Sequence, residues 1–286
     1  MNINEAYRKL CQDLLNKGHS VGRAANPKGA TVELNNYCFT VDELDKYPYI
    51  SLKSRDLSMT YLLGELTLYL DSRNDLKSYT TFSKFWENVS DDGLTVNSAY
   101  GYILQQKHGF NQIEKVVELL KTDQNTRRAV LNINVPNEHM IETKDEPCTI
   151  CLDFIIRDGK LNCTCVMRSN DVNFGLSYDY SYFVLIQRYI AQRVGVELGT
   201  YTHFAMSIHF YEKDRELIEK IANSGLEERK IKFFPDSLLK RYKDLLTVID
   251  HFTDDQTRKY KRDIFESQCV CEGIVNMCEV IEKSGN

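Results

Sequence analysis

Two short strands joined by a tight turn, with a cysteine before the first and an arginine after the second, constrain this chain most. Residues 151–157 and 161–166 are typical of strands, and the Asp158-Gly159 pair between them favours a two-residue hairpin turn. Antiparallel pairing brings the start of the first strand next to the end of the second. The sequence therefore predicts that Cys148 and Arg168 lie close together.

Composition limits the classes of protein that this chain can belong to. It has 286 residues, of which 42% are hydrophobic and 27% charged, and it has no apolar run long enough to span a membrane. The first residues lack a signal or transit pattern, so we expect a soluble cytoplasmic protein. We predict a single domain over 1–286, with a core of about 20–250 and a helical extension over 255–286.

The net charge of -5 offers no basic face for nucleic acid, whereas a small anion needs only a local arginine pocket.

Apolar periodicity predicts the secondary structure around the hairpin. Helices are expected over 4–17, 57–70, 113–121, 182–193, 211–223, 236–249 and 264–281, and strands over 31–41, 129–135, 199–209 and 230–234.

Nine cysteines raise the question of zinc or disulfides. Cys148 and Cys151 are three residues apart on a strand and point to opposite faces. Cys163 and Cys165 share a face, but no histidine stands at zinc-finger spacing beside them. We expect no metal site, and reduced thiols that pack as small apolar residues for all but one cysteine.

Several side chains could act in chemistry or merely support the fold. Cys148 is a candidate nucleophile because cationic neighbours favour a thiolate, although most cysteines are structural. Arg127, Arg128 and Arg168 form either a phosphate clamp with Ser169 or a solvated edge with surface ion pairs. Glu65 lies in an apolar helix, where a carboxylate costs free energy unless it is paired or used.

The order of residues along the chain favours the site over the structural alternative. The series comprises Arg23, Glu65, Trp86, Tyr100-Gly101, Arg127-Arg128, Pro147-Cys148, Arg168-Ser169, Asp171-Val172, Gly175-Leu176 and His209-Phe210-Tyr211. This order resembles the thymidylate synthase family, and most of all its phage deoxycytidylate hydroxymethylases. The resemblance implies an α+β fold in which helices pack on a large mixed β-sheet, with one sheet face forming a homodimer interface.

The resemblance also implies a role for each residue. Cys148 would attack carbon 6 of a pyrimidine nucleotide, and 5,10-methylenetetrahydrofolate would donate a one-carbon unit to carbon 5. The phosphate would be held by Arg23, Arg168 and Ser169, with Arg127 and Arg128 reaching across the dimer, and the sugar by His209 and Tyr211. Glu65 and Tyr100 would move protons, Trp86 and Asp171 would contact the pterin, and Asn170 and Gly175 would complete the nucleotide and folate sets.

Two departures from thymidylate synthases bear on the substrate. They usually carry histidine where this chain has Thr149, and asparagine where it has Asp179. An aspartate fits cytosine, because one oxygen accepts from the amino group and a shared proton serves ring nitrogen 3. Uracil presents a carbonyl oxygen that the carboxylate would repel. The alternative is that Asp179 caps a helix starting near Tyr180.

The predicted reaction is therefore conversion of deoxycytidylate (dCMP) to its 5-hydroxymethyl derivative. A water placed by Glu65, Thr149 and Asn170 would complete it, and the chain ends without an apolar tail that would exclude water. The enzymatic alternatives are a dCMP or CMP methyltransferase, a CMP hydroxymethylase, and a thymidylate synthase acting on deoxyuridylate (dUMP). A nucleotide-binding regulatory protein and a metal-binding role for the cysteines remain open as non-enzymatic alternatives.

Overall fold

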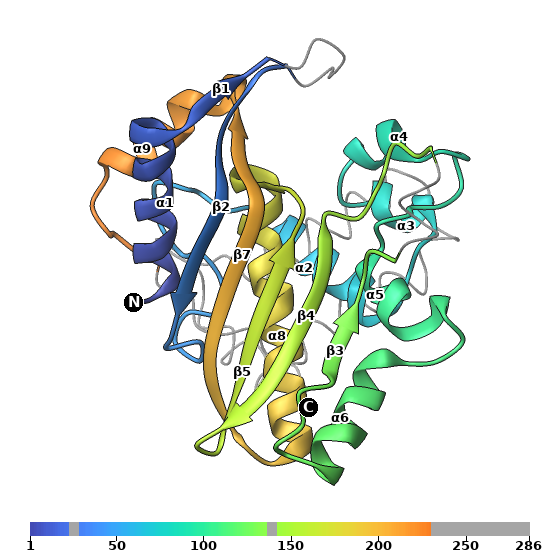
Figure 1. The fold of residues 1–286 in the computed structure, drawn as a ribbon. Coiled ribbons are helices and arrows are strands. Elements are labelled where there is room, and N and C mark those ends of the chain that lie inside the picture. The colour runs from blue at the N-terminus through green and yellow to red at the C-terminus, as the bar shows by residue number, and fades with distance from the viewer. Residues whose placement is uncertain (23–28, 136–141, 230–286) are drawn as a thin grey trace, which may run out of the picture. The chain divides into compact units, whose positions relative to one another are not determined.

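The computed structural model describes residues 1–22, 29–135 and 142–229 (Figure 1). Within these ranges the chain divides into two compact units, each described here by itself. The first contains Met1–Leu57, Pro147–Glu227 and the described part of 108–141. The second contains Ser58–Lys107, Glu142–Glu146 and the described residues 228–229. The single domain over 1–286 stays a prediction, and the elements expected at 230–234, 236–249 and 264–281 lie outside the described residues.

The first unit is built on a mixed sheet, which confirms the predicted α+β class. Its seven described strands are β1 (His19–Val21), β2 (Thr31–Val41), β3 (Ala129–Asn132), β4 (Thr149–Arg157), β5 (Lys160–Met167), β6 (Asn170–Asp171) and β7 (Glu197–Tyr211). Their order is β1-β2-β7-β5-β4-β3, and β6 also pairs with β7. The β5–β7 and β6–β7 pairs are parallel and the others antiparallel.

Helices of the first unit cover one face of this sheet. They are α1 (Ile3–Lys17), α6 (Gln112–Thr122), α8 (Ser177–Val194) and α9 (Arg215–Asn223), and Figure 1 shows α8 running behind β5 and β7. Leu152, Phe154 and Ile156 of β4 are buried, while alternate residues such as Asp153 are half-exposed. In Figure 1 no described helix of the first unit lies over the face opposite α8, and the alternation along β4 assigns Asp153 to that face.

The predicted hairpin is confirmed, and its turn chemistry explains it. Asp158 and Gly159 both have positive φ, 51° and 71°, as a tight turn that matches the twist of the strands requires. Arg157 pairs with Lys160, so the loop has two residues. Thr149 lies opposite Met167 at the other end, which places Cys148 and Arg168 at the same end of the hairpin.

Element boundaries differ from the sequence prediction where pairing overrides periodicity. The helix expected over 211–223 starts at Arg215 instead, after a 3₁₀ turn at Glu212–Asp214, because Tyr211 pairs with Thr31 as the final residue of β7. α8 begins at Ser177, five residues before the start expected from its apolar pattern at 182. A π-helical turn, η2 (Val172–Leu176), leads into it.

The second unit is helical. It comprises α2 (Met59–Leu70), α3 (Leu76–Thr80), α4 (Phe85–Val89), α5 (Tyr100–Tyr102) and the π-helical turn η1 (Ile103–Lys107). α5 packs closely on α2: a Cβ at Gly101 would lie 2.0 Å from the carbonyl oxygen of Tyr69, so only glycine fits. None of the helices in the described ranges combines the length and apolar character that a bilayer-spanning segment needs.

Candidate functional site

Cys148 and Arg168 meet at the open end of the hairpin, as the sequence predicts. The backbone N–H of Arg168 donates to the carbonyl oxygen of Cys148 at 2.9 Å. Arg168 Nε donates to the carbonyl oxygen of Pro147 at 3.0 Å, and that oxygen also accepts from Asn134 Nδ2 at 2.9 Å. Cys148 is half-buried and is not part of a disulfide. A cationic group is thus fixed to the peptide that carries the nucleophile candidate.

Asn170 and Asp179 form a second polar contact in the same unit. Asn170 Nδ2 donates to Asp179 Oδ2 at 3.0 Å. Asn170 is 1% exposed, and Asp179 is half-buried in the first turn of α8. The helix starts at Ser177, and its N-cap, Leu176, makes no capping hydrogen bond. The alternative that Asp179 caps this helix is therefore wrong, because Asp179 lies inside the helix.

Strand β7, strand β6 and the link before β6 carry four further predicted residues. Asp171 pairs with His209 between β6 and β7, and His209 packs edge-on against Tyr211 with ring centroids 5.3 Å apart. Both aromatic residues are buried. Asp171 Oδ1 accepts from the backbone N–H of Asn173 at 2.9 Å and so caps η2. Ser169 is half-buried in the short link between β5 and β6.

Arg127 and Arg128 lie towards the opposite end of the sheet from Cys148. Both are exposed, immediately before β3, whose first residue Ala129 pairs with Phe154. Phe154 is five residue steps along β4 from Thr149, which corresponds to about 17 Å along a strand. The structure thus does not bring these arginines to the Cys148 of their own chain. Arg23 lies outside the described residues.

Glu65 is a buried carboxyl group of the second unit with a raised pKa. It is 9% exposed on α2, and its Oε1 accepts from the Tyr61 hydroxyl at 2.9 Å. Burial raises the pKa of Glu65 from 4.5 to about 7, against the opposing effect of hydrogen bonds from Tyr61 and Tyr69. A carboxyl group with this pKa can both accept and return a proton at neutral pH.

Tyr69, on the same helix α2 as Glu65, contacts Tyr100 of α5. Tyr100 stacks on Tyr69 with ring centroids 5.7 Å apart. Trp86 is a different case, because it is 8% exposed and packs edge-on against Tyr79 and Phe85. Tyr69 therefore contacts both predicted proton-transfer residues, Glu65 through a hydrogen bond and Tyr100 through ring stacking. Trp86 packs within an aromatic cluster.

Sequence reasoning missed the residues that anchor the segment before the cysteine. Asp145 accepts from the backbone N–H of Ser98 at 2.8 Å and from its hydroxyl at 2.6 Å, and burial raises the pKa of Asp145. Thr143 donates to Asp91 at 2.6 Å. The signal available in the sequence was the polar run Asn97-Ser98 beside Tyr100.

Thr149 is fully buried, and its hydroxyl donates to the Met167 sulfur at 3.4 Å. The hydroxyl oxygen can still accept a hydrogen bond, so the role of Thr149 in placing a water stays a prediction. Among the described residues no group of three or more histidine, cysteine, aspartate or glutamate side chains is arranged to hold a metal ion.

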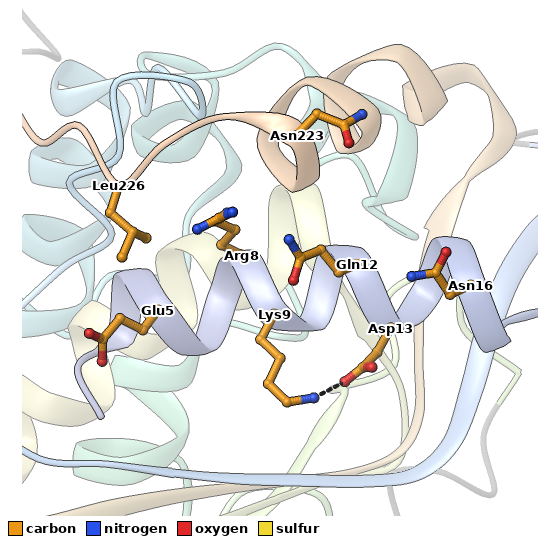
Figure 2. Close-up of a pocket in the computed structure, with 8 residues that line it drawn as sticks. All are labelled: Glu5, Arg8, Lys9, Gln12, Asp13, Asn16, Asn223 and Leu226. Atoms are coloured by element: carbon orange, nitrogen blue, oxygen red, sulfur yellow. Dashed lines mark hydrogen bonds and ion pairs between the residues drawn. The ribbon is translucent and has the colours of Figure 1, made fainter.

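A cavity of about 560 Å³ lies beside α1, and none of the predicted site residues that the structure describes lines it. Figure 2 shows Arg8, Gln12 and Asn223 around it. Asp13 on its wall is paired with Lys9 and with Lys17. The cavity therefore belongs to the surface of α1 rather than to the hairpin end where Cys148 lies.

Comparison with known proteins gives one family match and several relatives. Residues 5–260 match the family model described as thymidylate synthase. The chain is 33% identical to the deoxyuridylate hydroxymethyltransferase of Pseudomonas phage M6 over 171 residues, covering 59% of this chain and 48% of that protein. It is 32% identical to the protein of the same name from Bacillus phage SP01 over 194 residues, 62% of this chain and 51% of that protein.

A thymidylate synthase of Clostridium beijerinckii is 26% identical over 211 residues, covering 73% of this chain and 77% of that protein. The chain thus spans about half the length of the two phage relatives and more of the bacterial one.

Proposed function

Because the chain belongs to the thymidylate synthase family, we propose that it hydroxymethylates carbon 5 of dCMP. The family predicted from the order of motifs is thereby confirmed. Members of this family use methylenetetrahydrofolate as the one-carbon donor. The proposed reaction consumes dCMP, methylenetetrahydrofolate and water, and yields 5-hydroxymethyl-dCMP and tetrahydrofolate.

The observation that carries the choice of base is the hydrogen bond from Asn170 Nδ2 to Asp179 Oδ2. An amide N–H donates only to an acceptor, so Oδ2 serves as an accepting oxygen. Cytosine offers an amino donor at position 4 and a bare nitrogen at position 3. A carboxyl group with one accepting oxygen and one shared proton matches that edge, whereas the position-4 carbonyl of uracil would face an acceptor.

Covalent activation is assigned to Cys148. Its thiolate adds to carbon 6 of the pyrimidine, which makes carbon 5 nucleophilic, and Asp179 shares a proton with nitrogen 3 as charge develops there. Arg168 supports the thiolate through its positive charge. Arg168 and Ser169, together with Arg23, bind the 5′-phosphate, while His209 and Tyr211 bind the sugar.

The predicted folate residues fit a pterin by their chemistry. Methylenetetrahydrofolate supplies a one-carbon unit at the oxidation level of formaldehyde. Asp171 is a half-buried carboxylate, and carboxylates accept the N–H groups that a pterin presents. Phe174, three residues further along the chain, is 59% exposed and offers an aromatic surface to a pterin. Trp86 and Gly175 complete the proposed folate set.

Proton transfers are assigned to Glu65 and Tyr100. With a pKa of about 7, Glu65 is partly ionised at neutral pH and can orient and deprotonate the water that adds to the one-carbon unit on carbon 5. Tyr100 assists removal of the carbon 5 proton. Addition of water, rather than hydride, makes the product a hydroxymethyl derivative.

We also propose a homodimer in which the helix-free face of the sheet pairs with that of a second copy. This face carries half-exposed Asp153 and Phe204, and the 45%-exposed Met206. The same arrangement accounts for Arg127 and Arg128, which are exposed and lie far along the sheet from their own Cys148. In the dimer they bind the phosphate in the partner's site.

A second candidate is hydroxymethylation of dUMP. The names of the relatives from Pseudomonas phage M6 and Bacillus phage SP01 favour it. The two candidates share every step except recognition of the base edge. Asp179 and its contact with Asn170 favour dCMP.

Turnover with each nucleotide tests the proposal. The full chain is incubated with methylenetetrahydrofolate and dCMP, CMP or dUMP, and the products are weighed by mass spectrometry. We expect dCMP to gain CH₂O without formation of dihydrofolate. A gain of CH₂ accompanied by dihydrofolate would mean methylation, and a gain of CH₂O on dUMP alone would establish the second candidate. A protein that binds nucleotide without turnover would exclude both enzymatic functions.

A further inference from the structure

The Asn170 amide is buried, and only one of its two polar atoms has a hydrogen bond among the described residues. Its Nδ2 donates to Asp179 Oδ2, but its Oδ1 is inaccessible to solvent and makes no hydrogen bond among the described residues. An unsatisfied buried acceptor destabilises a fold, and an apolar side chain of the same shape would avoid that penalty. Asn170 is therefore poorly explained as a stabilising residue.

Gly175 leaves the space in which this contact forms. A Cβ at Gly175 would lie 2.8 Å from Asn170 Nδ2 and 3.4 Å from Asp179 Oδ2. The first distance is shorter than a side-chain carbon tolerates, so an alanine here would displace the amide. The φ angle of Gly175 is not positive, which means that space rather than backbone conformation requires glycine at this position.

We propose that Asn170 is a positioning residue that makes the two oxygens of Asp179 unequal and thereby sets the preference for cytosine. By donating to Oδ2 it holds this oxygen as the acceptor for the 4-amino group. The shared proton is left to Oδ1, where it serves nitrogen 3 of the base. Gly175 contributes to this positioning, because the absence of a Cβ leaves room for the Asn170 amide beside Asp179 Oδ2.

This inference rests on the proposed function, and base discrimination tests it. The measured quantity is the ratio of kcat/KM for dCMP to that for dUMP, with equilibrium binding of each nucleotide measured in parallel. Asn170→Leu keeps the approximate shape and removes the donor. We expect the ratio to fall by roughly 10- to 100-fold, the effect of losing one hydrogen bond to a charged group. The melting temperature should stay the same or rise, because the unsatisfied Oδ1 is removed.

Gly175→Ala should disturb the contact between Asn170 and Asp179 by placing a Cβ against the amide. It should therefore also lower the ratio of kcat/KM for dCMP to that for dUMP. Gly225→Ala is the matched control, since a Cβ there meets nothing within 4 Å. Asn162→Leu is the control for loss of an amide. Asn162 Oδ1 accepts from the Thr200 N–H at 2.9 Å and hydroxyl at 3.0 Å, so this variant should lose stability and keep its discrimination.

The outcomes separate this inference from the function on which it rests. If the wild-type protein does not prefer dCMP, the proposed base choice fails, and this inference fails with it. If the wild type prefers dCMP but Asn170→Leu keeps the ratio, only the inference is overturned. A melting temperature that falls while the ratio is unchanged would show Asn170 to be a structural residue.

Discussion

The backbone N–H of Arg168 is bonded to the carbonyl oxygen of Cys148 at 2.9 Å, between the two ends of the β4–β5 hairpin. Arg168 Nε is in turn bonded to the carbonyl oxygen of Pro147. The guanidinium is therefore tied to the peptide bond that precedes the thiol. We propose that its positive charge stabilises a thiolate and a bound phosphate.

Cys148→Ser should abolish turnover and leave nucleotide binding largely intact. A serine hydroxyl is a far weaker nucleophile than a thiolate, so we expect kcat to fall on the order of 10³-fold or more. The nucleotide dissociation constant should change little, because the proposed phosphate and sugar contacts do not use the sulfur. Steady-state kinetics and calorimetric titration with dCMP measure the two quantities.

Cys151→Ser is the matched control for this substitution. Burial, and then the neighbouring Asp153, raises the pKa of the Cys151 thiol, so it stays protonated and unreactive. Its replacement should leave kcat close to the wild-type value. If Cys148→Ser keeps its turnover, the assignment of Cys148 as the nucleophile is wrong.

Asp179→Asn should move substrate preference from dCMP towards dUMP. The new amide can donate to the position-4 carbonyl of uracil while its oxygen accepts from the ring N–H. Because the site then leaves cytosine's edge mismatched, we expect the ratio of kcat/KM for dCMP to that for dUMP to drop on the order of 10²-fold or more. Competition between the two nucleotides in one reaction gives this ratio directly.

Asp153→Asn is the corresponding control, since Asp153 is a half-buried carboxylate in the middle of β4. Its replacement should leave the base preference unchanged. Should Asp179→Asn still prefer dCMP as strongly as the wild type, our account of base recognition is wrong.

A structural feature could be predicted from the sequence when it is set by residues that are neighbours along the chain. The Asp158-Gly159 turn and the pairing it dictates follow from neighbouring residues, so the meeting of Cys148 and Arg168 was predictable. Strand β2 also has the predicted bounds, 31–41. Such features need no knowledge of the rest of the fold.

Contacts set by packing were not predictable from the same patterns. The π-helical turn η2 lies between Asn170 and Asp179 in sequence, and the two side chains are hydrogen-bonded. Apolar periodicity does not predict a π-helical turn. Ser98 and Asp145 are 47 residues apart in sequence. The pKa of Glu65 depends on the burial of the whole α2 face, which no local pattern quantifies.

Glu65→Gln should stabilise the protein increasingly as pH rises. The folded-state pKa of Glu65, about 7, is above its ordinary value of 4.5, so the fold favours the protonated form. The contribution of Glu65 to stability is full below about pH 4.5 and is lost as pH rises through 7. Glutamine cannot ionise and escapes this loss. Between pH 5 and pH 8 the stability gained over the wild type should grow by about 2 to 3 kcal/mol.

Urea unfolding at several pH values measures this difference, with Glu114→Gln as the control of opposite sign. Hydrogen bonding from Tyr189, and then pairing with Arg193, lowers the pKa of Glu114, so its carboxylate stabilises the fold above its ordinary range. Glu114→Gln should therefore be less stable than the wild type by a constant amount from pH 5 to 8. A difference for Glu65→Gln that is equally constant over this range would contradict a raised pKa.

Mixed dimers should recover activity if Arg127 and Arg128 act in the partner's site. One subunit carries Arg127→Ala and Arg128→Ala with its Cys148 intact, and the other carries Cys148→Ser with both arginines intact. A hybrid then has one complete site, made of one subunit's thiol and the other's arginines, and one site that lacks both. Random exchange makes half of the dimers hybrids, so activity should return to about a quarter of the wild-type value.

Each variant dimer alone should be nearly inactive, which sets the baseline for this recovery. Lys160→Ala in place of the arginine substitutions is the control, because Lys160 is an exposed cation at the hairpin turn and should leave its own dimer active. Arginines that served the thiol of their own chain would give no recovery on mixing, since neither subunit of the hybrid would hold a complete set. The exposure of both arginines and their position beside Ala129, opposite Phe154 rather than Thr149, favour recovery.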